Sequence, residues 1–318
     1  FLKMVAVVEV DKRADNLGLD PLPDIDFNIR CGNTLVGYAT EEELNNDLTW
    51  GDMFANAEFK EKVESEMQLV SMAYDTFKYV QLNQGENMAA FKQAKGELKQ
   101  RLASLNDTLN RRMHAATHLD YEDWLKSHQP FHWLAEFYQI IKDNGGFDVI
   151  IGNPPYVTFT DASLKYNVRQ YSTYNTKNLF ALCGERFTSL VCNNASIGYI
   201  IPLSGMSIDG FESLQNIIYL NCHSWNSYYS GDRNPSELFT GVKIRAGIYI
   251  SRHQKGNDRK YVGRYIKYSA AERGILFSKI NYVEIKDYIS APKVPTTIGY
   301  SILQKIRGMN TTLANKFI

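Results

Sequence analysis

Residues 145–157 read GGFDVIIGNPPYV, and this stretch decides how the rest of the chain is arranged. Its centre, Val149 to Ile151, is a short apolar run between glycines, which is typical of a strand buried on both faces in an α/β sheet. The two prolines that follow cannot donate hydrogen bonds to a neighbouring strand, so the chain must leave the sheet extended and rigid. Ligands of open α/β sheets bind beyond the carboxyl ends of strands. The stretch therefore places Asn153 and Tyr156 where a planar ligand would bind.

The composition is that of a folded protein without a strong charge bias. Hydrophobic residues make up 44% of the 318 positions, which is enough for one large or two ordinary domains. Basic and acidic residues number 35 each, so binding to nucleic acid would need a local basic surface. The four cysteines form no Cys-x-x-Cys pair, and the sequence has no signal peptide and no apolar span of membrane length. We therefore predict reduced thiols and a cytoplasmic location.

A helical hairpin is predicted from about residue 53 to residue 113. Apolar side chains recur three or four positions apart in two segments, separated by the polar stretch QLNQGEN. Packing of these stripes on each other or on the main domain is the simpler interpretation, and partner binding is the alternative. Because it separates two strand-like regions, the hairpin is interpreted as an insertion.

Strands and helices alternate around this insertion. The segment DFNIRCGNTLVGY before it has the alternation of a strand. After the quoted stretch we predict a helix, a strand, a helix and two adjacent strands at the edge of the sheet; their sequences are NTKNLFALCGERFTSLVCNN, IGYIIP, IDGFESLQNIIYL, CHSWNSYYSG and VKIRAGIYISRH. The pattern becomes less periodic beyond residue 260, which predicts the start of a second domain.

The Asn-Pro-Pro-Tyr loop has groups suited to activating an aromatic amine. Such an amine is a poor nucleophile because its lone pair is delocalised into the ring, so activation needs hydrogen-bond acceptors rather than a strong base. The side-chain oxygen of Asn153 and the carbonyl of Pro154 can accept both amine hydrogens. Tyr156 can stack on a base that has left the duplex. The structural alternative is an ordinary proline-rich turn with a packed tyrosine.

Four ordered blocks support the enzymatic interpretation: LPDIDFNIRCGNTLVG, FHWLAEFYQIIKDNGGFDVIIGNPPYV, NLFALCGERF with GYIIPLSGM, and ELFTGVKIRAGIYISRHQKG. With them the chain resembles the amino-methylating DNA methyltransferases that act on adenine N6, in particular the large bacterial ones of fused restriction-modification systems. The resemblance implies an incomplete Rossmann-like methyltransferase sheet that uses S-adenosylmethionine. It also implies double-stranded DNA as a partner, with a nuclease or specificity region in the same full-length chain.

The resemblance assigns roles to individual residues. It implies that Asn153, Pro154 and Tyr156 bind and activate the target adenine and that Pro155 faces the cofactor. By the same resemblance, Asn33 and Thr34 contact the adenine ring of S-adenosylmethionine, and Phe239 is the second aromatic residue beside the flipped base. Family members often have Asp where Asn33 stands, but an amide oxygen can also accept a hydrogen bond from the cofactor's amine.

The resemblance also implies a domain organisation. We expect a catalytic domain at residues 1–40 and 130–263, a helical insertion at residues 41–129, and the start of a target-recognition domain at residues 264–318. The family's glycine-rich methionine-binding turn would precede Phe1, and no Gly-x-Gly occurs in the sequence. We therefore expect an incomplete cofactor pocket and no methyl transfer from these residues alone. An inactive DNA-binding specificity module, or a methyltransferase for protein glutamine or ribosomal RNA, remains the alternative.

Three other patterns in the sequence bear on function. A basic run after the last predicted strand either holds DNA phosphates or is a solvated loop; it contains Arg252, Lys255, Arg259, Lys260, Arg264 and Lys267. The pairs His114/His118 and His128/His132 have helical metal-ligand spacing but no third ligand in register, so no metal site is predicted. Pro23-Asp24 followed by Glu58-Phe59-Lys60 loosely matches a metal-nuclease pattern, for which surface charge is the better explanation.

Overall fold

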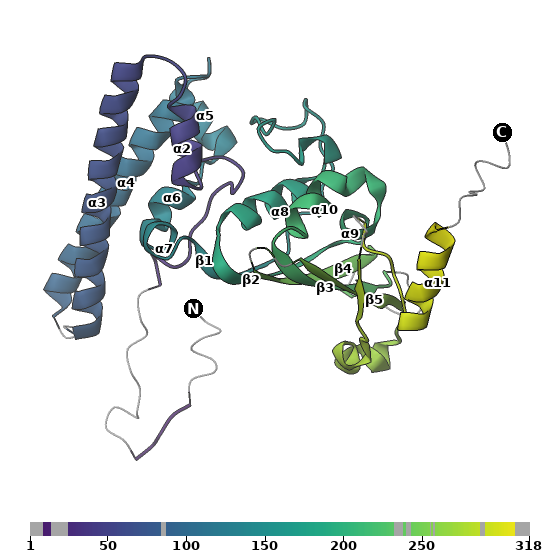
Figure 1. The fold of residues 1–318 in the computed structure, drawn as a ribbon. Coiled ribbons are helices and arrows are strands. Elements are labelled where there is room, and N and C mark those ends of the chain that lie inside the picture. The colour runs from purple at the N-terminus through teal and green to yellow at the C-terminus, as the bar shows by residue number, and fades with distance from the viewer. Residues whose placement is uncertain are drawn as a thin grey trace.

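The computed structural model describes residues 9–13, 25–83, 87–231, 238–239, 243–254, 256, 258–286 and 290–308. The apolar start of the chain at residues 1–8, Pro23-Asp24 and Lys255 lie outside these residues. Figure 1 shows a helical lobe on one side, a sheet with helices packed on it in the centre, and helix α11 (Thr297–Arg307) at the far end. No helix in the described part of the chain is both long and apolar enough to span a membrane.

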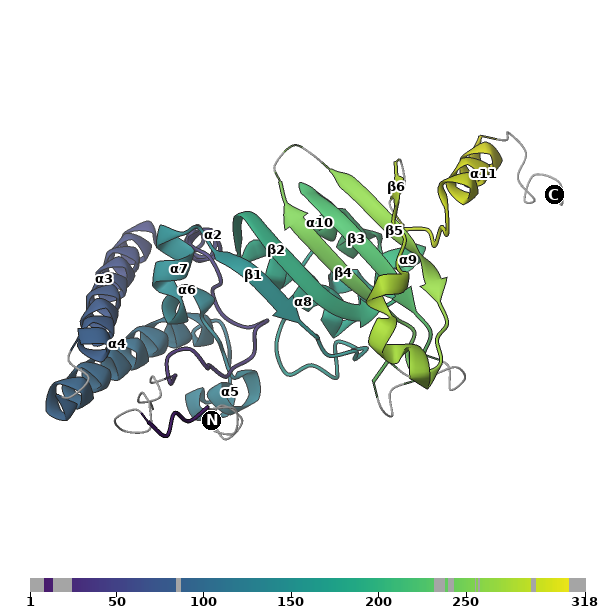
Figure 2. The same ribbon diagram turned by 90° about the horizontal axis from the view of Figure 1, so that it is seen from below.

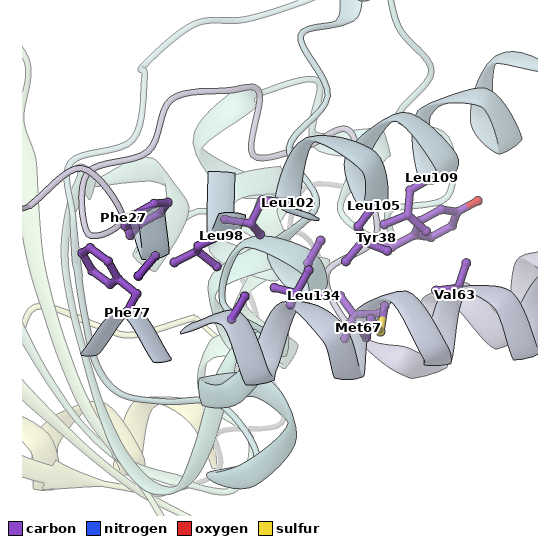
Figure 3. Packing of buried hydrophobic residues seen from close by; sticks show 14 of the residues in the cluster. Phe27, Tyr38, Val63, Met67, Phe77, Leu98, Leu102, Leu105, Leu109 and Leu134 are labelled. Atoms are coloured by element: carbon purple, nitrogen blue, oxygen red, sulfur yellow. The ribbon is translucent and has the colours of Figure 1, made fainter. Parts of the chain in front are cut away.

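The predicted helical hairpin is confirmed. Helix α3 (Met53–Asn83) and helix α4 (Met88–His114) pack along their length through the apolar stripes seen in the sequence. Figure 3 shows Val63 and Met67 of α3 beside Leu105 and Leu109 of α4. The first three residues of QLNQGEN belong to α3, so the connection is shorter than predicted.

The core of the hairpin includes residues on both sides of it in the sequence. Phe27 and Tyr38 precede the hairpin, Leu134 follows it, and all three are buried in the same apolar cluster. Short helices complete this lobe: α2 (Glu41–Asp47), α5 (Tyr121–His128), α6 (Trp133–Glu136) and α7 (Tyr138–Asp143). The insertion therefore folds onto its flanking segments and shares one core with them.

The strand predicted in DFNIRCGNTLVGY is wrong. Residues 26–38 form turns, and a β-bridge joins Asn33 to Pro130. The backbone bonds the segment at residues 129–134 instead of a strand: Asn33 donates to the carbonyl of Gln129 at 2.7 Å and Val36 accepts from Phe131 at 2.7 Å. Gly37 allows this close approach, since its φ is +126° and a β-carbon there would lie 2.3 Å from the Phe131 carbonyl oxygen.

The α/β class is confirmed by a mixed sheet, to which the described residues contribute six strands in the order β1-β2-β4-β3-β5-β6. The strands are β1 (Phe147–Gly152), β2 (Val191–Pro202), β3 (Cys222–Tyr229), β4 (Ala246–His253), β5 (Arg259–Ile266) and β6 (Val283–Ile285). Pairing makes β1, β2, β3 and β5 run in one direction and β4 and β6 in the other. Helix α8 (Leu179–Ser189) connects β1 to β2, and α10 (Glu212–Ile218) lies between β2 and β3, as in Rossmann-like units.

The helices cover one face of this sheet. Alternate residues of β2, such as Ile197 and Tyr199, are buried with side chains of α8 and α10. Figure 2 looks onto the opposite face, where much of the sheet has no helix in front of it. The expectation that β1 is buried on both faces is therefore wrong for the described residues: Val149 is 57% exposed and Ile151 is 84% exposed, because among these residues β1 pairs with β2 alone and is covered on one side.

Two further expectations about the sheet need correction. The segments predicted as edge strands pair with each other as β3 and β4, but they lie inside the sheet because β5 and β6 extend it. The domain boundary expected at residue 264 falls within β5, so the sheet continues past it. Short 3-10 helices at Ala270–Ile275 and Phe277–Lys279 precede β6.

Candidate functional site

The Asn-Pro-Pro-Tyr loop leaves the carboxyl end of β1. Gly152 ends the strand beside helix α8, where a β-carbon would lie 3.1 Å from the Phe187 ring. Asn153 and Pro155 are exposed, whereas Pro154 between them is buried. The loop therefore presents the Asn153 amide to solvent on a backbone that proline holds rigid.

Tyr156 is held from two sides. Its hydroxyl donates a hydrogen bond to the Ile200 carbonyl of β2 at 2.9 Å, and its ring meets Phe180 of α8 edge to face with centroids 6.5 Å apart. The ring is half-buried, and burial raises the pKa of Tyr156 to about 12. The phenol is therefore neutral at physiological pH and is oriented by a backbone acceptor of the sheet.

The next segment, residues 157–178, is a loop closed at its base. Leu179 donates to the Val157 carbonyl at 2.9 Å, Phe159 donates to the Lys177 carbonyl at 2.9 Å, and Thr158 forms a bridge with Asn178. These bonds join the residues directly after Tyr156 to the start of α8. We call residues 157–178 the target loop.

Two carboxylates hold the target loop in shape. Asp161 accepts from Lys177 at 2.8 Å, from Arg169 at 3.0 Å and from the Tyr174 hydroxyl at 2.6 Å, and the Lys177 bond lowers the pKa of Asp161. Glu185 of α8 accepts from both the backbone and the hydroxyl groups of Ser172 and Thr173, at 2.8–3.0 Å. A cavity of about 330 Å³ lies within the loop.

Asn33 and Thr34, predicted to contact a cofactor, lie in the turn that docks onto residues 129–134. The side-chain oxygen of Asn33 accepts from the Leu35 amide at 3.1 Å, and the Thr34 hydroxyl accepts from the Trp133 indole at 3.1 Å. Both residues are partly exposed. Asn33 retains its amide hydrogens and a second lone pair, so it can both donate and accept.

The fold brings this turn against the target loop, although more than 120 residues separate them. Leu35 is buried in one apolar cluster with Phe159 and Tyr171 of the loop and with Leu182 and Cys183 of α8. Burial raises the pKa of the Cys183 thiol to about 12, which keeps it protonated and apolar in character. The proposed cofactor side and base side of the site thus share one core.

Phe239 follows the carboxyl end of β3 and is half-buried. Since β1 and β3 are parallel, Tyr156 and Phe239 follow strands that end at the same edge of the sheet. With β2 and β4 between them, these strands lie about 14 Å apart. Any contact of both rings with one base must therefore be made by the loops beyond the strands.

The structure does not gather the basic run into one patch. Arg252 and Arg259 are exposed opposite His223, at the amino end of β3 and away from Asn153, whereas Arg264 and Lys267 are exposed near the other end. Lys260 lies partly buried, with its ammonium 3.8 Å from the Tyr219 ring centroid, and burial lowers its pKa to about 8. Successive side chains of β5 point to opposite faces of the sheet, and the strand runs from one end of the sheet to the other. Basic residues that are close in sequence are therefore far apart in the structure.

The histidine pairs have structural contacts. His132 accepts from the Tyr38 amide through Nδ1 at 3.1 Å, and its Nε2 lies 3.0 Å from Oδ1 of Asn110. His128 stacks on Trp124, and His114 Nε2 lies 2.7 Å from the Leu119 carbonyl. In the described ranges, no three His, Cys, Asp or Glu side chains are grouped to hold a metal ion. Glu58 of the nuclease-like pattern is exposed on α3.

Arg186 and Tyr171 were not predicted from the sequence. Arg186 is 3% exposed on the side of α8 that faces the target loop, where it bonds the Tyr171 hydroxyl at 2.5 Å and the carboxylate of Glu43 in α2. The signal was present, because Arg186 follows the apolar Leu182 by four positions and so lies on the same helix face. A charged residue at such a position predicts a buried ion pair.

Residues 60–234, more than half of the chain, match the Eco57I restriction-modification methylase family model. The match begins in α3 and includes the Asn-Pro-Pro-Tyr loop and all of β3. The chain is also 25% identical over 282 residues to a protein of Methanocaldococcus jannaschii whose name describes a type II restriction enzyme and methyltransferase. That alignment covers 76% of this chain and 23% of the relative, so the chain spans about a quarter of the relative's length.

Solved structures with partial similarity come from restriction-modification enzymes. A nuclease-deletion mutant of the Type ISP enzyme LlaGI with a DNA substrate mimic has a TM-score of 0.39 and 13% identity, covering 64% of this chain and 23% of that chain. The Type IIL enzyme MmeI in complex with DNA has a TM-score of 0.33 and 14% identity, covering 73% of this chain and 40% of that chain.

Proposed function

Because the chain belongs to the Eco57I restriction-modification methylase family, we propose that it carries the target-base half of a DNA methyltransferase site that modifies adenine at N6. The observation that carries this proposal is the exposed Asn153 amide at the carboxyl end of β1, next to a tyrosine whose hydroxyl is fixed by Ile200. An acceptor and an aromatic ring side by side fit a planar base that carries an exocyclic amine.

The chain's own residues have distinct tasks in this reaction. The Asn153 oxygen and the Pro154 carbonyl accept the two N6 hydrogens, which concentrates the nitrogen lone pair for attack on a methyl carbon. The rigid Pro-Pro backbone keeps these acceptors in place before the reaction, so no reorganisation is needed as positive charge develops on the nitrogen. Tyr156 supplies a face for the extruded base and offsets part of the unstacking cost of a few kcal/mol.

The cofactor in this proposal is S-adenosylmethionine, which supplies an electrophilic methyl group when bound. Its adenine edge presents an amine donor beside a ring-nitrogen acceptor, and one Asn side chain can satisfy both. Asn33 fits this requirement, because the bond to the Leu35 amide occupies one lone pair of its oxygen and leaves its amide hydrogens available. We propose Asn33 and Thr34 for the adenine ring, and Pro155 for the side of the loop that faces the cofactor.

Double-stranded DNA is the proposed substrate, and Phe239 is the proposed second aromatic contact of the flipped base. Among the basic residues, Arg264 and Lys267 lie nearer the carboxyl ends of the parallel strands, so we propose these two for phosphate contacts at the site. The remainder of the full-length chain would supply sequence recognition and any nuclease.

A direct test uses the full-length protein and genomic DNA from a host without adenine methylation. After incubation with methyl-labelled S-adenosylmethionine, the DNA is digested and its nucleosides are identified by mass spectrometry. Labelled N6-methyladenine in the wild-type reaction, and its loss in Asn153→Ala, is the expected result. A label found in cytosine, in RNA or in protein glutamine would overturn the proposal.

A further inference from the structure

A buried polar bridge joins the two sides of the proposed site. The Arg186 guanidinium of α8 donates to the Tyr171 hydroxyl at 2.5 Å, and that hydroxyl donates to the Leu35 carbonyl at 3.1 Å. Arg186, Tyr171 and Leu35 are 3%, 6% and 3% exposed. The bridge therefore runs from the helix, through the target loop, to the turn that carries Asn33 and Thr34.

The charge of this bridge is balanced from the helical lobe. Arg186 is paired with Glu43, whose other carboxylate oxygen accepts from the Ala39 amide at 2.9 Å. A buried guanidinium is stable only with such partners, and removing one of them is costly. Nε of Arg186 has no hydrogen-bond partner in the described part of the chain, so the network is not saturated.

The bridge is distinct from the bonds that shape the target loop. Asp161 acts within the loop, and Glu185 joins the loop to α8. Neither contact reaches residues 33–36. The Tyr171 hydroxyl is the group that bonds both the Leu35 backbone and Arg186, and burial raises its pKa, so it remains a neutral donor.

We propose that Arg186 and Tyr171 are positioning residues that couple the turn at residues 33–36, where the cofactor is proposed to bind, to the target loop. This proposal rests on the proposed function. A ligand that orders residues 33–36 fixes the Leu35 carbonyl, and the Tyr171 hydroxyl transmits this order to the loop that follows Asn153–Tyr156. Cofactor binding thereby prepares the loop for the extruded base, and by linkage the base strengthens cofactor binding.

The test is hydrogen exchange of the full-length protein with and without S-adenosylhomocysteine, a non-reactive product of the proposed cofactor. In the wild type, the ligand should slow amide exchange in peptides covering residues 33–36 and also in those covering the target loop, by about fivefold or more. In Tyr171→Phe, which keeps the ring and removes the hydroxyl, the protection at residues 33–36 should remain and the protection of the loop should be lost.

Tyr174→Phe is the matched control, since it removes a hydroxyl from the same loop that bonds Asp161 and not Leu35. Tyr174→Phe should retain ligand-induced protection of the loop. If the loss in Tyr171→Phe came only from a general loosening of the loop, Tyr174→Phe would lose the protection as well. Equal loop protection in wild type and Tyr171→Phe would overturn the coupling. Wild-type protein without protection at residues 33–36 would overturn the cofactor placement and this proposal with it, whereas failure to form N6-methyladenine would contradict the proposed function alone.

Discussion

The hydroxyl of Tyr156 donates a hydrogen bond to the backbone carbonyl of Ile200, 2.9 Å away on the neighbouring strand β2. This bond ties the residue that follows Pro155 to the sheet itself, so the ring is positioned by a rigid element and not by the loop alone. Two properties of Tyr156 can thus be separated by mutation: the orientation given by its hydroxyl and the stacking surface given by its ring.

Tyr156→Ala should weaken binding of the full-length protein to its target DNA by about 1–3 kcal/mol, because one base stack is lost. Tyr156→Phe keeps the ring and loses the bond to Ile200, so its binding should be closer to wild type. The measurement uses a fluorescent adenine analogue at the target position: stacking on Tyr156 partly quenches it, and Tyr156→Ala should relieve that quench. Identical affinity and fluorescence in wild type and Tyr156→Ala would contradict the stacking role.

Asn153→Ala should lower turnover by about 10²-fold or more, which is the scale for one preorganised polar group aimed at the reacting atoms. Since Asn153 is exposed, the substitution should leave the melting temperature nearly unchanged. Single-turnover methylation kinetics and a thermal melt of the same sample separate the two effects. Near-normal turnover in a folded variant would refute the assignment.

His132 should make stability depend on pH. It is 1% exposed, accepts from the Tyr38 amide, and burial lowers its pKa from 6.5 to about 3. The unfolded chain therefore binds a proton below pH 6.5 that the folded chain does not bind until pH is near 3. Stability from this group is complete above pH 6.5 and decreases as pH falls below it, by up to about 1.4 kcal/mol per pH unit.

Chemical denaturation of His132→Gln across pH 7 to 5 tests this sign. The variant should show a shallower loss of stability on acidification than wild type, whatever its stability at pH 7. His118→Gln is the matched control for replacing a histidine by glutamine, because that side chain is exposed. A slope in His132→Gln as steep as in wild type would show that other groups cause the acid sensitivity.

Gly37 and Gly96 should respond in opposite directions to substitution by alanine. At Gly37 the φ of +126° and the Phe131 carbonyl 2.3 Å from an added β-carbon predict a loss of more than about 1 kcal/mol. Gly96 lies exposed within α4 with open space around it, so alanine should stabilise the helix by up to about 1 kcal/mol. Thermal melts of both variants are the measurement, and a tolerated Gly37→Ala would contradict the docking of this turn.

Local patterns in the sequence were sufficient for the elements whose side chains repeat with a fixed period. Three features could be predicted in this way: the stripes of α3 and α4, the strand before Asn153, and the alternation of helices and strands after it. The periods of helices and strands can be recognised from residues that are close together in the sequence. The same reasoning failed at residues 26–38, where hydrogen bonds to a distant segment replaced the expected strand.

From the sequence alone one can infer the hairpin, the strand that ends at Gly152, the position of the Asn-Pro-Pro-Tyr loop after that strand and the resemblance to a methylase family. The tertiary structure decided that β4 lies antiparallel between β2 and β3, that Arg252 and Lys267 lie near opposite ends of the sheet, and that Tyr171 bonds both Leu35 and Arg186. These features join residues far apart in the chain. Which distant segments pack together depends on the free energy gained when their surfaces are buried against each other. The periodicity of neighbouring residues does not reveal that free energy.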